Sequence, residues 1–233
     1  MFQGNEMAED TGAVERAYRT LKEMAASFEF KPDERLNESA ISVQLSISRT
    51  PLREALNRLT AEGFLTFRRG QGFHCRSLNP AEMLDLYEAR SAIEAEAARL
   101  AARRADAQGV ADLRAFLQQS ESRYTGGVSP VELVRLDEEF HRRLALLSRN
   151  AELVRLLDNA AARIHYIRVI DLQLLGERDG TQAITIQPHA RILDAVAAGD
   201  EDGAGAEMRG HITRRLEEVT NNVRLAFSRL YAP

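Results

Sequence analysis

The chain has 233 residues, of which 44% are hydrophobic and 28% charged, and its formal net charge is −4. This composition is typical of globular proteins and excludes a wholly disordered or collagen-like chain. The single cysteine, Cys75, excludes an intramolecular disulfide framework and a four-cysteine zinc site. No apolar run approaches the roughly 18 residues that cross a bilayer, and the N-terminus carries no export signal. We therefore expect a cytoplasmic protein without membrane contact.

In chain order, residues 1–10 read as a disordered tail or cloning remnant, and residues 11–78 as a small domain. Apolar residues at helical or alternating spacing define the elements of this domain. They are a helix from about Gly12 to Phe28, a short helix over Glu38–Leu45 capped by Asn37, a helix from Ser48 or Thr50 to about Glu62, and a hairpin with strands around Leu65–Phe67 and Phe73–Cys75. Three helices followed by a hairpin are typical of a winged helix-turn-helix domain.

After Asn79-Pro80 the pattern is helical throughout. Helices are expected at about 81–104, 110–124, 130–148, 152–174, 183–198 and 202–230. Short breaks at glycine or asparagine separate them, which indicates an antiparallel bundle. The sequence therefore predicts a mainly α fold, with an N-terminal winged helix-turn-helix domain over 11–78 and a C-terminal six-helix bundle over 79–233.

Basic residues concentrate in the first domain. Between Arg35 and Arg76, seven basic residues outnumber three acidic ones, although the whole chain is acidic. A local basic cluster in an acidic protein is expected where one face meets a polyanion such as double-stranded DNA. The alternative is a solvated surface without a partner.

The start of the third helix carries the groups that suit DNA. Arg49 and Arg53 are four residues apart and project beside the apolar stripe, where their guanidinium groups can bind guanine or phosphate. Free N–H groups and nearby hydroxyls at a helix start are further phosphate donors. At the hairpin tip, glycine allows a close approach to a minor groove. The candidate DNA-binding residues are Ser48, Arg49, Thr50, Pro51, Arg53, Arg69 and Gly70.

The bundle contains four candidate metal ligands. Asp137 and His141 are four residues apart, so their side chains point the same way on one helix. His189 and His211 each lie at the inward edge of a later helix. One carboxylate and three imidazoles can hold a divalent first-row cation and leave coordination positions open. Zinc is expected first, with nickel, manganese or iron as alternatives. For each histidine alone, an ordinary core or surface role is the competing interpretation.

Several of these segments resemble the DNA-binding domain of GntR-family bacterial transcription regulators. They are Leu36-Asn37-Glu38, the run from Ser48 to Leu56, Glu62-Gly63-Phe64-Leu65 and Arg69-Gly70-Gln71-Gly72-Phe73. The two-domain organisation of the chain is similar to that of the FadR subfamily, whose C-terminal part is the all-helical FCD effector domain. Some relatives have a DNA-contacting arginine in the second helix, where this chain has Ser39.

The later residues also resemble the FCD pattern. The D-x-x-F-H segment matches Asp137 to His141, and the later histidine pair matches His189 and His211. The resemblance implies that these four residues hold a metal that helps to bind a small carboxylate or sugar-acid effector. It also implies that Arg90 pairs with the effector by a charge-assisted fork. An exposed helix arginine or an interhelical ion pair is the alternative for Arg90.

Together these patterns predict a transcription regulator and not an enzyme. A homodimer would bind a pseudo-palindromic operator, because one recognition helix reads only a few base pairs. An organic acid bound at the metal would change DNA affinity, and most relatives act as repressors. Two alternatives remain open: a metal-dependent enzyme that uses the one-Asp, three-His site, and a regulator whose metal is purely structural.

Overall fold

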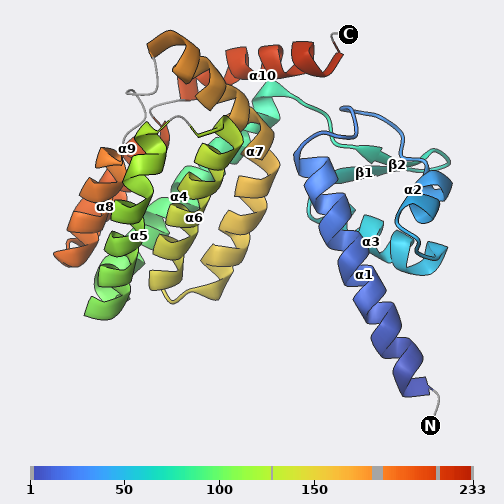
Figure 1. The fold of residues 1–233 in the computed structure, drawn as a ribbon, viewed down its shortest axis with the longest axis horizontal. Helices are drawn as coiled ribbons and strands as arrows, with labels where there is room; N and C mark the ends of the chain where they lie inside the picture. Colours follow the sequence, from blue (N-terminus) through green and yellow to red (C-terminus); the bar gives the residue numbers. More distant parts are fainter. Residues whose placement is uncertain (1–2, 127, 180–185, 214–215, 232–233) are drawn as a thin grey trace. The chain divides into compact units, whose positions relative to one another are not determined.

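The computed structural model describes residues 3–126, 128–179, 186–213 and 216–231 (Figure 1). The chain divides into two compact units, Met1–Leu78 and Asn79–Pro233. The fold is mainly helical with one antiparallel hairpin, as the sequence predicts. Over the described ranges, the helices all fall short of the length and apolarity that a membrane span requires.

Among its described residues, the first unit contains three helices and two strands. They are α1 (Gln3–Ala26), α2 (Glu38–Gln44), α3 (Arg49–Ala61), β1 (Leu65–Arg68) and β2 (Gly72–Cys75). The helix α1 starts at Gln3 and not near Gly12, so residues 3–10 are helical instead of forming the expected tail. The middle of this stretch, Glu6 to Glu9, consists of Glu, Met and Ala, which favour helix, and Gly12 weakens a helix without ending it.

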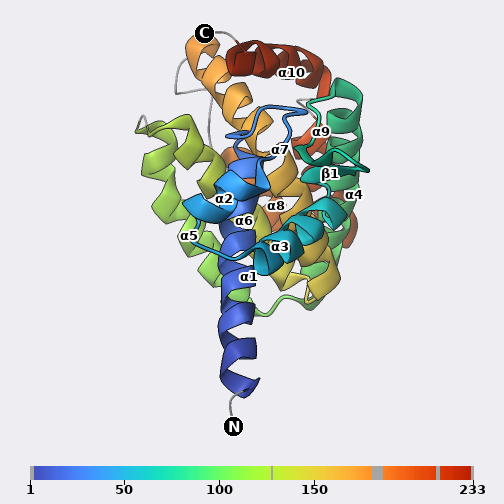
Figure 2. The ribbon, with the colours of Figure 1, turned by 90° about the vertical axis from the view of Figure 1, so that its right-hand side faces the viewer.

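The helix α3 is held by its apolar stripe. Leu52, Leu56 and Leu59 are fully buried, and α3 packs on α1; Figure 2 shows α3 lying across α1. The shorter helix α2 begins at the predicted cap, because the Asn37 side chain accepts a hydrogen bond from the Ala40 N–H at 3.0 Å.

The hairpin follows the predicted alternation. Leu65 pairs with Cys75 and Phe67 with Phe73, so the apolar side chains are paired across the two strands. The turn between them needs left-handed backbone at Gly70, where φ is +76°. Cys75 is fully buried, and burial raises the pKa of its thiol to about 12.

The second unit contains seven helices within the described ranges. They are α4 (Pro80–Arg104), α5 (Ala107–Thr125), α6 (Pro130–Leu147), α7 (Ala151–Asp179), α8 (Gln187–Ala197), α9 (Glu201–Thr213) and α10 (Leu216–Tyr231). Two expected bounds are wrong. The helix α5 starts before Gly109, because Asp106 caps it by accepting from the Gly109 N–H at 2.8 Å. The helix α7 continues through Gly176, which was expected to end it. The start of the helix expected at 183–198 lies partly outside the described residues.

The prediction of one long helix from Asp202 to Leu230 is also wrong, because α9 and α10 are separate helices. The helix α9 packs on α4 and α8, whereas α10 packs on α4 and α7. Figures 1 and 2 show α10 lying across the other helices of this unit at one end. One straight helix could not make both sets of contacts, so tertiary packing overrides the continuous helical pattern.

Candidate functional site

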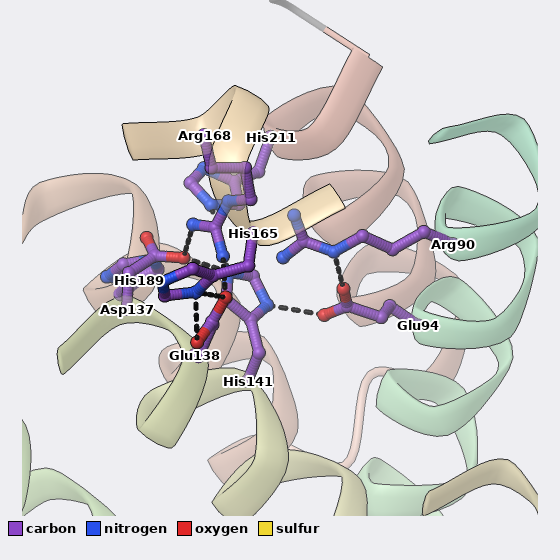
Figure 3. A network of polar contacts seen from close by, with 9 residues as sticks. All are labelled: Arg90, Glu94, Asp137, Glu138, His141, His165, Arg168, His189 and His211. Carbon is purple, nitrogen blue, oxygen red and sulfur yellow. Dashed lines mark hydrogen bonds and ion pairs between the residues drawn. The ribbon is translucent and has the colours of Figure 1, made fainter. Parts of the chain in front are cut away.

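The structure brings the four predicted metal ligands together. Asp137 and His141 come from α6, His189 from the first turn of α8, and His211 from the last turn of α9. One ligand atom of each residue lies within 4.8 Å of those of the others. Figure 3 shows these side chains converging from three helices on one point of the unit.

Packing fixes the direction of these ligands. The Phe140 ring stacks on His189 with ring centroids 4.2 Å apart. The His141 and His189 side chains are both only 2% exposed. Pro188 lies within the first turn of α8, where its missing N–H costs no helical hydrogen bond. The His189 ring is therefore held at the helix start by a rigid backbone and an aromatic neighbour.

The ligand atoms have the arrangement and chemistry that a divalent cation requires. His189 Nε2 lies 3.2 Å from Asp137 Oδ1, and His141 Nε2 lies 3.3 Å from Asp137 Oδ2. His211 Nε2 and His141 Nε2 are 3.3 Å apart. His189 Nε2 is buried and makes no hydrogen bond with the described residues. Three imidazole nitrogens and a carboxylate oxygen facing one point suit a first-row divalent cation.

The electrostatics of the cluster favour an ionised Asp137 and neutral His189 and His211, whose lone pairs can bind a cation. Burial opposes ionisation of Asp137, but Arg168 and His141 outweigh it and hold its pKa well below the usual range. Burial lowers the pKa of His189 and, together with the neighbouring histidines, lowers that of His211 to about 2. His141 differs, because Glu94 and Asp137 overcome its burial and raise its pKa. A bound cation would take the place of the proton that these carboxylates favour on His141.

A second layer of charged residues, which the sequence did not reveal, surrounds the ligands. Arg168 of α7 pairs with Asp137, and its other terminal nitrogen lies 3.4 Å from Glu138. Glu138 in turn lies 3.0 Å from His165 Nδ1. Glu138 therefore lies beside the site, whereas Glu139 points away from it and pairs with Arg143 at the surface. No spacing signal links Arg168 to Asp137, because they are 31 residues apart.

Arg90 of α4, the predicted effector residue, is buried and only 4% exposed. Its Nε lies 2.5 Å from Glu94 Oε1 on the same helix, and the other oxygen of Glu94 contacts His141 Nδ1. The two terminal nitrogens of Arg90 form no hydrogen bond or ion pair with the described residues. Figure 3 shows the guanidinium group pointing toward the ligand cluster. Arg90 is thus not an exposed arginine, and the ion pair that it forms with the described residues lies within α4 and not between helices.

The predicted DNA-binding residues of α3 divide into exposed and buried groups. Ser48, Arg49, Thr50 and Arg53 are exposed, whereas Pro51 is buried with the apolar stripe. The Ser48 hydroxyl makes no capping hydrogen bond. Arg49 and Arg53 line a cleft of about 630 Å³, together with Arg35, Glu38, Ser39 and Gly72. Ser39 thus lies beside the two arginines of the recognition helix.

The tip of the hairpin presents Arg69, a cation without an ion-pair partner among the described residues. Arg69 is exposed and forms no ion pair with the residues that the structure describes, and Gly70 beside it is exposed as well. A Cβ atom on Gly70 would meet nothing within 4 Å. The neighbouring Arg68 differs, since it pairs with Asp33 at 2.7 Å. The tip therefore offers an exposed guanidinium group and an open backbone.

Comparisons with known proteins identify both units. Residues 13–75 match the family of bacterial regulatory proteins described as the gntR family, and residues 85–214 match the FCD domain. The "Nta operon transcriptional regulator" of Aminobacter aminovorans is 42% identical over 209 residues, which are 89% of this chain and 95% of that relative. The chain belongs to the GntR family. The resemblance to GntR-family regulators with an FCD domain is therefore confirmed.

Other relatives of this GntR-family regulator are also transcriptional regulators or share its fold. The "HTH-type transcriptional repressor GlaR" of Escherichia coli (strain K12) is 28% identical over 84% of this chain and 90% of its own length. The solved structure "E. coli McbR/YncC" has a TM-score of 0.64 at 21% identity and covers 93% of this chain and 98% of that chain. This likeness shows a shared fold. The exposed arginines lie in the gntR match, and all four candidate metal ligands lie in the FCD domain.

Proposed function

We propose that this regulator binds operator DNA as a homodimer, and that a small organic acid bound at a metal in the FCD domain changes its DNA affinity. The observation that carries the proposal is the convergence of Asp137, His141, His189 and His211 in one buried cluster. Residues 11–78 would form the DNA-binding domain, and residues 79–233 the effector-binding and dimerisation domain. The transcriptional regulators among the relatives favour this function over a metal-dependent enzyme.

The groups on α3 support binding to duplex DNA. Arg49 and Arg53 occupy the first turns of a recognition helix and are exposed, so both can enter a major groove. A guanidinium fork can bind both acceptors of guanine or clamp a phosphate. The exposed Ser48 and Thr50 would bind the phosphate backbone of the DNA through their hydroxyls, and Arg69 at the hairpin tip would reach an adjacent groove. The buried Pro51 would act only by starting the helix.

A dimer follows from the size of one recognition helix. A single helix contacts only a few base pairs, and a second copy related by two-fold symmetry doubles the contact and matches a pseudo-palindromic operator.

The ligand cluster supports a metal as part of the effector site. When bound, a divalent cation supplies a positive charge and open coordination positions for an anionic oxygen atom. Zinc suits three imidazoles and one carboxylate best, and nickel, manganese or iron are the alternatives. Asp137 and the three histidines would hold the cation, and Arg168 keeps Asp137 ionised.

Charge favours an anionic effector. Arg90 and Arg168 carry two positive charges against the three negative charges of Glu94, Asp137 and Glu138. With neutral histidines, a bound dication leaves this group with one net positive charge. The terminal nitrogens of Arg90 form no hydrogen bond or ion pair with the residues that the structure describes, and they face the cluster, so they suit a carboxylate fork. A small carboxylate or sugar acid meets these conditions.

A screen of small carboxylic and sugar acids by thermal shift, with and without added zinc, tests the proposal. A true effector raises the unfolding temperature by mass action, and we expect that rise only with zinc present. Metal analysis of protein purified without chelator should show about one equivalent per chain. Far less than one equivalent contradicts the metal assignment. Loss of folding on chelation, without any acid response, would instead support a structural metal.

The DNA half is tested separately, by selecting bound fragments from genomic DNA at modest salt concentration. A regulator of this kind enriches an inverted-repeat sequence, and the enriched fragment should lose affinity when the acid found in the screen is added, or gain affinity if the acid acts as a co-repressor. Failure to enrich any fragment contradicts the DNA-binding half of the proposal.

A further inference from the structure

Glu94 lies between the effector arginine and a metal ligand. Its Oε1 is 2.5 Å from Arg90 Nε, and its Oε2 contacts His141 Nδ1. The Glu94 side chain is 1% exposed, so water cannot take over either contact. Oε2 and Nδ1 are each buried and have no other partner among the described residues. Figure 3 shows this chain of contacts running from α4 to the ligand cluster.

We propose that Glu94 is a positioning residue that selects the ring nitrogen with which His141 binds the metal. A neutral imidazole has one nitrogen that donates a hydrogen bond and one that carries a lone pair. An ionised carboxylate only accepts, so the nitrogen that faces Glu94 must carry the hydrogen. The proton therefore lies on Nδ1, and the lone pair of Nε2 points at Asp137, His189 and His211. Carboxylates in this position orient ligand histidines in many metal sites.

The same carboxylate holds Arg90. A guanidinium group only donates, and here its Nε donates to Oε1 of Glu94. This contact uses the inner edge of the guanidinium group and leaves both terminal nitrogens for the effector. Glu94 must therefore accept from two donors at once, one on each oxygen. The metal ligand and the effector arginine are joined through one side chain.

A glutamine at position 94 cannot replace this function, although it has the same shape. A carboxamide has one accepting oxygen and one donating nitrogen, whereas Arg90 and His141 both present donors. In Glu94→Gln, either Arg90 Nε or His141 Nδ1 faces an N–H group. If His141 changes to the tautomer with its hydrogen on Nε2, that nitrogen no longer has a lone pair for the metal.

Zinc affinity, measured by competition with a chromophoric chelator, tests this positioning role. In Glu94→Gln we expect about 10- to 100-fold weaker binding, although every metal ligand is intact. Glu138→Gln is the matched control, because it removes the same charge beside the same cluster but contacts Arg168 and His165 and no ligand histidine. A much smaller loss in Glu138→Gln supports the tautomer argument. Equal losses in the two variants, or unchanged affinity in Glu94→Gln, overturn it.

A measurement on the unmodified protein removes any dependence on how the variant folds. Two-bond ¹H–¹⁵N correlation spectra of the zinc-loaded protein report which nitrogen of each histidine carries a hydrogen. We expect His141 to be protonated on Nδ1 and to bind zinc through Nε2, and the opposite pattern overturns the inference. The inference rests on the proposed metal site, and its failure is distinguishable. A wild-type chain that takes up no zinc refutes the proposed site, whereas zinc binding with the wrong tautomer refutes only the role of Glu94.

Discussion

The two candidate sites hold their charged groups in opposite ways. On the winged domain, Arg49 and Arg69 are exposed and form no ion pair with the described residues, and Arg53 has a single carboxylate partner at 3.5 Å. In the FCD domain, Asp137 and Arg168 are mostly buried and contact each other. Exposed charges contribute little to folding, whereas removal of one buried partner leaves the other uncompensated. We therefore expect substitutions in the first site to change binding alone, and in the second to change stability as well.

The largest expected effect is on stability and falls in the FCD domain. Arg168→Met leaves Asp137 and Glu138 without their shared cation and should lower the free energy of unfolding of the metal-free protein by about 3–5 kcal/mol. Chemical denaturation measures this loss. Saturating zinc should reduce it, because the cation would compensate Asp137. Arg142→Met is the control, since the pair of Arg142 with Asp158 is exposed and contributes about 0–1 kcal/mol.

The second prediction distinguishes stabilisation by the metal from the stability of the metal-free fold. At a free zinc concentration of 100 times the dissociation constant, zinc should stabilise the wild-type chain by about 2.7 kcal/mol. His189→Ala should lose most of this zinc-dependent difference, whatever its stability without metal. The measurement is denaturation of both proteins with and without zinc. An undiminished zinc effect in the variant would show that His189 is not a ligand.

A third effect should appear in binding alone. Arg49→Ala is expected to weaken specific DNA binding by about 1–3 kcal/mol if this side chain reads a base, and to leave the unfolding transition unchanged. Fluorescence anisotropy with the selected operator measures the loss. Arg19→Ala removes another exposed arginine, from α1, and should keep full affinity. Equal losses from the two variants would mean that only overall charge matters.

The smallest effect is a pH slope in the metal-free protein. The folded-state pKa of His211 lies below the usual 6.5, at about 2, because the site is buried and the neighbouring histidines are close. The unfolded chain therefore binds more protons below pH 6.5, and stability falls as the pH is lowered from there, by at most about 1.4 kcal/mol per pH unit for this group. His211→Gln should flatten the slope between pH 6.5 and 4.5. An identical slope in the variant would contradict the assignment.

Local features of the fold could be predicted from the sequence. The Asn37 cap fixes the start of α2 within a few residues, and the apolar spacing of α3 fixes its buried face. The four-residue spacing of Asp137 and His141 also places them on one side of α6, since helix geometry alone determines that. Each of these signals depends on residues within about one turn of each other.

Several features that depend on contacts between different helices could not be predicted. Arg168 meets Asp137 only because α6 and α7 pack together, and nothing local in the sequence marks that pair. Glu94 lies 47 residues before His141 and was hidden for the same reason. The division between α9 and α10 also follows from packing, because the local pattern continues across it.

The buried thiol of Cys75 offers a way to observe one half of the molecule by itself. This residue is in the hairpin of the winged domain, is fully enclosed and has a pKa near 12. A thiol of this kind reacts with an alkylating reagent only after its surroundings open. Because the chain has one cysteine, the rate of its labelling measures how often the winged domain opens. Events in the helical domain change this rate only if the two domains are energetically coupled. An effector that alters the labelling rate would demonstrate coupling between the two domains in the absence of DNA.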